Sequence, residues 1–242
     1  MRRPRISAPS TWLAAAVVLV ALVVLTVVWT AASPDDAARG GGAEGDRSVR
    51  ETDGTVGPIV ALGDSLTADT REAPATGGRA HESWYVRALA AEPRLANAYN
   101  AGIAGNTTPD MLARFPRDVA AWSPRVVVIL GGTNDLAAGR TTEQVLDTLE
   151  QLVELVRDLG ATPVLGTVPP RTDADFAEQV EDLNAAIRAA AEDGGTTVID
   201  FFSVLADDDG GWRPGYTADG VHPGVAAADA MAELAVETLL GE

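Results

Sequence analysis

From Pro58 to the C-terminus, short apolar runs alternate with longer amphipathic segments. This alternation predicts strands followed by helices, and therefore an α/β domain with a mostly parallel sheet and helices on both faces. A chain of 242 residues, 46% of them hydrophobic, can bury one sizeable domain of this kind. The expected strands are PIVAL (58–62), RVVVIL (125–130), TPVLGTV (162–168) and TTVIDFF (196–202), with ANAYNAG (96–102) as a weaker candidate.

Amphipathic stripes between these runs predict the helices. A Thr141–Gln144 capping box opens one helix, which we expect to end at Gly160. Another helix is expected to start near Trp84, and Pro223 suits the first position of the last one. Apolar residues at helical spacing mark three buried helix faces: Val145, Leu149, Leu152, Val153, Val156 and Leu159; Phe176, Val180, Leu183 and Ile187; and Ala228, Met231, Ala232, Ala235 and Leu239.

The N-terminal segment has a pattern typical of a targeting signal. Three arginines precede residues 12–32, which are uncharged and long enough to cross a bilayer as a helix. We therefore predict that residues 1–32 are an uncleaved, single-pass transmembrane signal-anchor in the cell membrane, with the rest of the chain outside the cytoplasm. The alternative is a signal peptide cleaved before Ser33, which would give a secreted protein.

Residues 33–56 are polar and glycine-rich, which is typical of a flexible linker. The folded domain is then expected to span residues 57–242. A GxGxxG match at residues 40–45 has no strand before it and no helix after it, so it does not indicate a dinucleotide site.

The composition excludes several kinds of site. The formal charge is −17, so we expect no nucleic-acid partner and contact with the membrane only through the N-terminal helix. All 18 basic residues are arginine, and the absence of lysine excludes a Walker A loop and a Schiff-base lysine. The absence of cysteine excludes a thiol nucleophile, disulfides and Cys-ligated zinc. Any chemistry must come from hydroxyl groups, carboxylates and two histidines, His81 and His222.

Four short polar segments adjoin the expected strands or the last helix. They are GDSL (63–66), NAGIAGNT (100–107), GGTND (131–135) and DGVHP (219–223). Because working residues of a parallel sheet collect in loops at the carboxyl ends of its strands, we expect these segments to lie close together.

Each segment carries a part that acyl transfer requires. Ser65 is the candidate nucleophile, and His222 can take its proton as general base and later deliver it to the leaving group. Asp219, three residues before His222, can hold the other imidazole nitrogen. The backbone N–H groups of Ser65 and Gly105, together with the side-chain amide of Asn134, could form an oxyanion hole.

These four segments, in this order, resemble the motif blocks of the SGNH (GDSL-type) serine hydrolases. The matching residues are Gly63-Asp64-Ser65-Leu66, Gly105, Asn134, and Asp219 with His222. The resemblance implies a three-layer α/β/α sandwich with a flavodoxin-like sheet. It also implies a Ser-His-Asp triad whose Asp and His share one loop.

Other polar residues have simpler interpretations. Asp64 is expected to support the turn, Asp135 to be structural and His81 to be solvated. Asp200, which follows TTVI, is the alternative triad acid. The acidic run 207–209 lacks the alternating ligands of a calcium loop, and two distant histidines do not make a zinc site. We therefore expect neither a metal nor a cofactor.

The combined interpretation is an exported serine ester hydrolase of the carboxylesterase, lipase or O-deacylase type, acting through an acyl-enzyme. Its substrate would be a small-molecule, lipid or glycan acyl ester. One alternative uses the same triad in an O-acyltransferase that acts on a cell-envelope glycan. An alternative of another class is a non-catalytic, membrane-tethered glycan-binding module.

Overall fold

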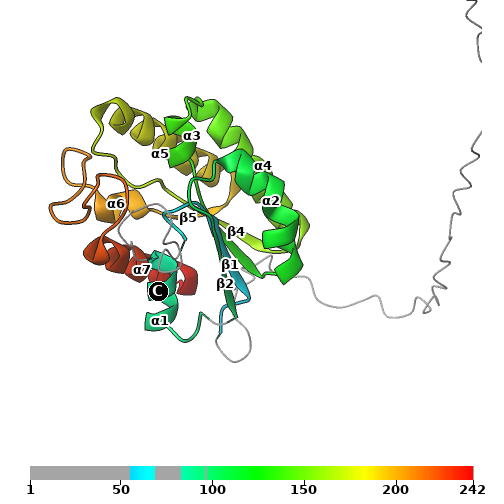
Figure 1. Cartoon of the computed structure of the whole chain (residues 1–242). Coiled ribbons are helices and arrows are strands. Elements are labelled where there is room, and N and C mark those ends of the chain that lie inside the picture. Colours follow the sequence, from blue (N-terminus) through cyan, green and yellow to red (C-terminus); the bar gives the residue numbers. More distant parts are fainter. Residues whose placement is uncertain (1–54, 69–82, 96, 242) are drawn as a thin grey trace, which may run out of the picture. The chain divides into compact units, whose positions relative to one another are not determined.

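A computed structural model describes residues 55–68, 83–95 and 97–241 of the chain. Within them, five strands form one sheet in the order β2-β1-β3-β4-β5, and every neighbouring pair is parallel (Figure 1). This is the strand order of flavodoxin-like doubly wound sheets, so the predicted sheet is confirmed. The strands are β1 (Ile59–Gly63), β2 (Ala98–Gly102), β3 (Val126–Leu130), β4 (Thr162–Gly166) and β5 (Thr197–Ile199).

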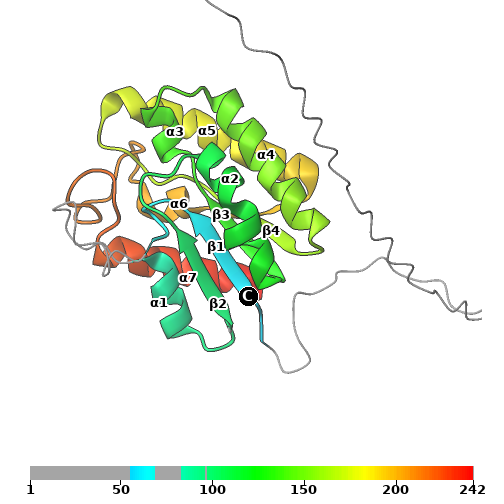
Figure 2. The same ribbon diagram turned by 45° about the vertical axis from the view of Figure 1, so that its right-hand side comes forward.

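Helices cover both faces of the sheet, which gives the predicted three layers (Figure 2). On one face, α1 (Trp84–Ala91) and α6 (Phe201–Leu205) pack on α7 (Val225–Leu240). On the other face, α2 (Thr108–Asp118) and α5 (Ala174–Gly194) pack on α4 (Thr142–Asp158). The short helices η2 (Ala120–Trp122) and α3 (Thr133–Ala137) follow α2 and β3.

The strands divide their side chains between two hydrophobic clusters, because successive residues of a strand point to opposite faces. Ile59 and Ala61 of β1 belong to the cluster beneath α1, α6 and α7. Val60 and Leu62 belong to the cluster beneath α2, α4 and α5. Burial on both faces explains why β1 and β3 are continuous apolar runs in the sequence.

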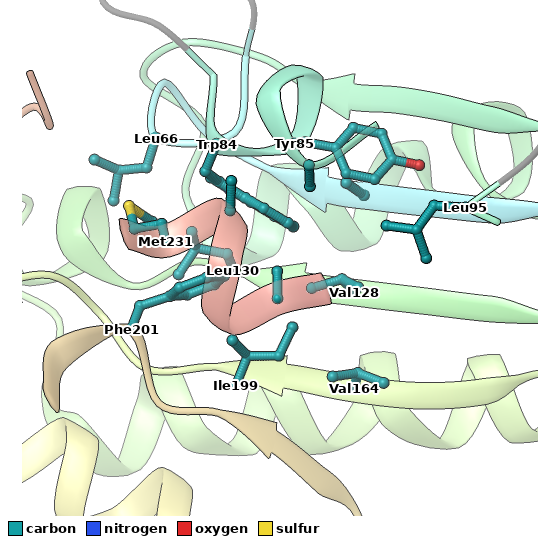
Figure 3. Packing of buried hydrophobic residues seen from close by; sticks show 14 of the residues in the cluster. Leu66, Trp84, Tyr85, Leu95, Val128, Leu130, Val164, Ile199, Phe201 and Met231 are labelled. Carbon is teal, nitrogen blue, oxygen red and sulfur yellow. The ribbon is translucent and has the colours of Figure 1, made fainter. Parts of the chain in front are cut away.

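Aromatic rings fill much of the first cluster (Figure 3). The ring centroid of Trp84 lies 5.4 Å from that of Tyr85 and 5.0 Å from that of Phe201. Met231 of α7 belongs to the same cluster. The Tyr85 hydroxyl donates a hydrogen bond to the Ile59 carbonyl (2.9 Å). Helix α1, which starts at Trp84 as predicted, is thereby fixed to β1.

Two boundaries differ from the prediction at the C-terminal part of the domain. Phe201 does not continue the last strand but begins α6. Helix α7 begins at Val225, with Gly224 as its N-cap, so Pro223 lies before the helix and not in its first turn. The reason is that Pro223 forms an antiparallel bridge with Thr217, which keeps the chain extended up to Gly224.

Helix α2 has no counterpart among the predicted elements, although its start carries a clear signal. Thr107 and Asp110 form a capping box, and a proline lies in the first turn. The buried face of α2 includes two charged residues, Arg114 and Asp118. An apolar stripe therefore does not reveal this helix, because part of its buried surface is an ion pair.

The predicted anchor, residues 1–32, and most of the predicted linker lie outside the described residues. Val56 is already buried, and its N–H donates a hydrogen bond to the Arg94 carbonyl (2.7 Å). The packed domain therefore includes Val56, one residue before the predicted boundary. Among the helices of the described residues, none has the length and apolar character needed to cross a membrane.

Candidate active site

Ser65 lies in a tight turn at the carboxyl end of β1. Gly63 ends the strand, and a Cβ atom there would lie 2.3 Å from Thr67 Oγ1, so the turn closes only around a glycine. The Asp64 carboxylate accepts a hydrogen bond from the Leu66 N–H (2.8 Å) across the turn. The turn leaves Ser65 8% exposed, at the edge of the sheet where the carboxyl ends of all five strands meet.

Ser65, His222 and Asp219 form one chain of hydrogen bonds. Ser65 Oγ lies 3.0 Å from His222 Nε2, and His222 Nδ1 lies 2.8 Å from Asp219 Oδ2. Ser65 and His222 are 157 residues apart in the sequence, so the fold brings them together from β1 and from the loop before α7. The three residues selected from the sequence therefore lie in a row, each within hydrogen-bonding distance of the next.

Asp219 holds His222 through its backbone as well as its ring. Its Oδ1 accepts hydrogen bonds from the N–H groups of Val221 (2.9 Å) and His222 (2.8 Å), while Oδ2 faces the imidazole. Partial burial alone would raise the pKa of Asp219, but these N–H donors and the imidazole lower it well below its usual value. Asp219 is thus ionised at neutral pH. An ionised Asp219 favours the tautomer with the proton on Nδ1, which leaves Nε2 to accept from Ser65.

The loop that carries Asp219 and His222 is tied down by neighbours that motif spacing does not reveal. Thr217 Oγ1 donates to the His222 carbonyl (2.9 Å) and accepts from the Gly220 N–H (3.0 Å). The Gly220 carbonyl in turn accepts from Trp212 Nε1 (3.2 Å) and from the Thr172 N–H (3.1 Å). These bonds hold the loop against the segment that follows β4.

Asn134, in the first turn of α3, connects the other predicted site segments. Its Nδ2 donates to the Asn106 carbonyl (2.9 Å) and to Asp64 Oδ2 (3.2 Å). Gly105, next to Asn106, has a φ of +79°, a conformation that favours glycine, and among the residues that the structure describes a Cβ atom there would meet no atom within 4 Å. Asn134 thus connects the turn that carries Ser65 to Asn106, the residue that follows Gly105.

Two buried carboxylates lie beside Asn134. Asp135 accepts hydrogen bonds from the Thr108 N–H (2.9 Å) and Oγ1 (2.7 Å), and it lies 3.2 Å from Arg140 Nε. Burial raises the pKa of Asp64 to about 7, against the effect of the Leu66 N–H, and the charge of Asp135 adds to the rise. These contacts fit the structural roles predicted for both residues. Asp64 in addition holds Asn134.

Residues 61–230 match the model of the GDSL-like lipase/acylhydrolase family, a span that includes all four polar segments. The chain belongs to this family. Esterase TesA of Pseudomonas aeruginosa is 29% identical over 186 residues, which cover 75% of this chain and 87% of that protein. An arylesterase of Vibrio mimicus is 27% identical over 187 residues, which cover 75% of this chain and 88% of that protein.

Solved structures agree with this assignment. A GDSL-like lipase of Bacteroides thetaiotaomicron superposes with a TM-score of 0.63 at 26% identity, over 75% of this chain and 86% of that one. An acetylxylan esterase of Geobacillus stearothermophilus shares the fold, with a TM-score of 0.64 at 22% identity over 75% and 93% of the two chains. The SGNH resemblance and its α/β fold are therefore confirmed. This GDSL-like chain is an ester-bond hydrolase, which argues against the non-catalytic binding module.

Asp200, the alternative acid, is committed to other partners in this GDSL-like hydrolase. Its carboxylate accepts hydrogen bonds from Thr167 Oγ1 (2.9 Å) and from Nη2 (2.8 Å) and Nε (3.0 Å) of Arg188. Asp219, in contrast, faces the His222 imidazole. Geometry therefore favours Asp219 over Asp200 as the partner of the imidazole.

The acidic run 207–209 does not take part in this site, within the part of the chain that the structure describes. His81 lies outside the described residues. Asp207 accepts hydrogen bonds from the Asp209 N–H (3.1 Å) and the Gly211 N–H (3.0 Å), so its carboxylate closes its own loop. In the part of the chain that the structure describes, no three histidine or acidic side chains are arranged to hold a metal ion.

Proposed function

We propose that this hydrolase cleaves carboxylic esters through an acyl-enzyme on Ser65. His222 acts as general base and acid, and Asp219 orients the imidazole. The observation that carries the proposal is the unbroken chain of short contacts from Ser65 Oγ through both nitrogens of His222 to Asp219 Oδ2. A serine hydroxyl is a weak nucleophile unless an adjacent base can take its proton, and His222 lies within that reach.

Acylation begins with attack of Ser65 Oγ on the ester carbonyl, while His222 Nε2 takes the hydroxyl proton. The imidazolium that forms is stabilised by the ionised Asp219 at Nδ1. Collapse of the tetrahedral intermediate breaks the bond to the alcohol oxygen. His222 returns the proton to that oxygen, and the alcohol leaves.

Deacylation repeats these steps with water as the nucleophile. His222 takes a proton from the water as its oxygen attacks the acyl-enzyme carbonyl. The second tetrahedral intermediate then expels Ser65 Oγ, which recovers its proton from His222. The products are a carboxylic acid and an alcohol, and no cofactor is needed to balance the reaction.

The oxyanion of both intermediates would be held by the N–H groups of Ser65 and Gly105 and by Asn134 Nδ2. Asn134 Nδ2 lies farther from Asp64 Oδ2 (3.2 Å) than from the Asn106 carbonyl (2.9 Å). An oxyanion at this place would therefore compete for the amide hydrogen with Asp64, which makes the longer of the two contacts. The bond to Asn106 would keep the amide in place.

The experiment that tests this proposal is hydrolysis of p-nitrophenyl esters of graded acyl length by the full-length protein. We expect at least one ester to be cleaved, and cleavage to be lost in Ser65→Ala. Product analysis with and without an added glycan acceptor separates hydrolysis from acyl transfer. Undiminished cleavage by Ser65→Ala would refute the proposed nucleophile.

We further propose that the domain works outside the cytoplasm. The basis is the arginine-led apolar segment of residues 12–32. Retention in the membrane fraction after a high-salt wash would indicate an uncleaved anchor, because an apolar attachment resists salt. Recovery from the medium with Ser33 as the first residue would indicate a cleaved signal. Recovery of the intact chain in the cytoplasmic fraction would refute export.

A further inference from the structure

Arg114 is a buried arginine of α2 whose guanidinium reaches out of the helix. The residue is only 8% exposed. Its Nη2 donates to the Gly63 carbonyl at the end of β1 (2.8 Å), and its Nε donates to Asn106 Oδ1 after β2 (2.7 Å). Its Nη1 pairs with Asp118, one turn later in α2 (3.0 Å). One side chain therefore connects α2 to the ends of two strands.

The first of these contacts lies next to the nucleophile turn. Gly63 is two residues before Ser65, and its carbonyl also accepts a hydrogen bond from the Ile103 N–H (3.0 Å). Arg114 thus saturates the last carbonyl of β1 at the point where the chain turns. The position of the Ser65 N–H depends on where that turn starts.

The second contact lies between the other two oxyanion donors. Asn106 directly follows Gly105, and the backbone carbonyl of Asn106 accepts a hydrogen bond from Asn134 Nδ2 (2.9 Å). By holding the Asn106 side chain, Arg114 fixes the residue that both places the Gly105 N–H and orients the Asn134 amide.

We propose that Arg114 is a positioning residue that fixes the spacing of the three oxyanion donors on Ser65, Gly105 and Asn134. This inference rests on the function proposed above for those donors. A guanidinium suits the task because it carries five N–H donors in one rigid plane, which a lysine ammonium cannot reproduce. Its burial strengthens these hydrogen bonds, because water does not compete for the acceptors.

If the oxyanion donors are no longer held at a fixed spacing, they stabilise the tetrahedral oxyanion less well. Binding of the planar ester depends less on that spacing and should change little. The loss therefore falls on kcat and leaves KM nearly unchanged. Removal of one oxyanion donor costs about 10²–10³-fold in kcat. For displaced but still present donors, we expect a loss of about 10–100-fold.

The test compares Arg114→Lys with Arg117→Lys in the full-length protein, using a p-nitrophenyl ester that the wild type cleaves. Arg117 also pairs with Asp118, but its side chain is 73% exposed, and its guanidinium bonds to Asp118 and not to Gly63 or Asn106. It is the matched control. We expect kcat to fall about 10–100-fold with KM nearly unchanged in Arg114→Lys, and wild-type values in Arg117→Lys.

A third variant, Asn106→Ala, tests the same contact if Arg114→Lys does not fold. It removes the acceptor for Arg114 Nε but keeps the backbone carbonyl that holds Asn134. We expect it to lose kcat to a similar extent, and the double variant with Arg114→Lys to be little worse than the poorer single variant.

The outcomes separate this inference from the proposed function. If Asn134→Ala has a lowered kcat, then a wild-type kcat in Arg114→Lys overturns the inference. If Arg114→Lys does not fold, a wild-type kcat in Asn106→Ala overturns it instead. A lower melting temperature with wild-type kcat assigns Arg114 a purely structural role and overturns it as well. Wild-type kcat in Asn134→Ala removes the proposed donor itself, and the inference falls with it.

Discussion

The two sides of the active site are constructed differently. On one side, Asp219 and His222 lie three residues apart on a single loop, and their side chains are 56% and 27% exposed. On the other side, Asn134 contacts Asp64 across 70 residues of sequence. Asp64 and its neighbour Asp135 are fully buried. The first side is formed by residues close in sequence and is exposed to water. The second is formed by residues distant in sequence and is buried.

This difference determines what each side contributes. In the exposed loop, water screens the charges, so Asp219 holds His222 mainly through short, directed hydrogen bonds. In the buried network, a polar group that loses its partner cannot be compensated by water, and the loss is costly. We therefore expect variants of the exposed side to abolish chemistry and leave the fold intact. Variants of the buried side should lower both the activity and the stability of the fold.

The largest effect is expected from His222→Ala. Without a base for the Ser65 hydroxyl, kcat should fall by about 10⁴-fold or more, to a level similar to that of Ser65→Ala. The double variant should be little worse than either single variant, because the two residues act as one unit. Steady-state kinetics on a p-nitrophenyl ester measure these losses.

A loss of stability in His222→Ala, in addition to the loss of activity, would contradict the expected difference between the two sides of the site. Circular dichroism and melting temperature must therefore accompany the kinetics. His81→Ala and Asp200→Asn serve as controls, and each should keep kcat within about a few-fold. An inactive His81→Ala beside an active His222→Ala would show that the wrong histidine has been assigned.

A smaller effect on kcat, combined with a loss of stability, is expected from Asn134→Ala. Removal of the amide should lower kcat by about 10²–10³-fold with little change in KM. It also removes the amide donor from Asp64 Oδ2 and from the Asn106 carbonyl, which should lower the free energy of unfolding by about 1–3 kcal/mol. Asn134→Asp should be worse on both counts, because its carboxylate would face the oxyanion and Asp64.

Parallel kinetics and thermal melts of the Asn134 variants measure both effects. A fully active Asn134→Ala protein would mean that another group stabilises the oxyanion. An Asn134→Ala protein that is inactive but keeps the wild-type melting temperature would show that the buried side does not contribute to stability in the way expected here.

The smallest effect concerns the pH dependence of stability through Asp64. Its pKa in the folded chain is about 7, whereas an aspartate in an unfolded chain titrates near pH 4. Between about pH 4 and 7 the folded state keeps a proton that the unfolded state has lost, so stability falls as pH rises through this range. Asp64→Asn cannot ionise and avoids that loss. Its melting temperature relative to wild type should therefore rise between pH 5 and pH 8.

Thermal melts of both proteins at the two pH values measure this difference. A constant difference between pH 5 and pH 8 would show that Asp64 is not the group responsible. A relative decrease for Asp64→Asn would reverse the sign and indicate that the ionised carboxylate stabilises the fold.

Much of the fold was accessible from the sequence because the periodicity of apolar residues reports burial directly. It predicted all five strands and the helices that begin at Trp84 and Thr142. The His222 partner was accessible for a similar reason, since Asp219 lies on the same loop and needs no tertiary information. Sequence spacing thus predicts contacts well where the contacting residues are close together in the chain.

The buried polar network was not accessible in the same way. Arg114 and Thr108 are buried, yet neither lies in an apolar stripe, and the capping box around Thr108 does not indicate which carboxylate its side chain contacts. Their roles depend on which strand ends meet, and this is set only when the sheet assembles. The capping box of α2 would have revealed the helix but not the reach of the Arg114 side chain.

The most direct test of the central assignment is labelling with a fluorophosphonate, which reacts with an activated serine. We expect a single adduct, located on Ser65 by peptide mass spectrometry, and labelling slowed by orders of magnitude in His222→Ala. A single adduct on any other residue, or equally fast labelling of Ser65 in His222→Ala, would contradict this assignment.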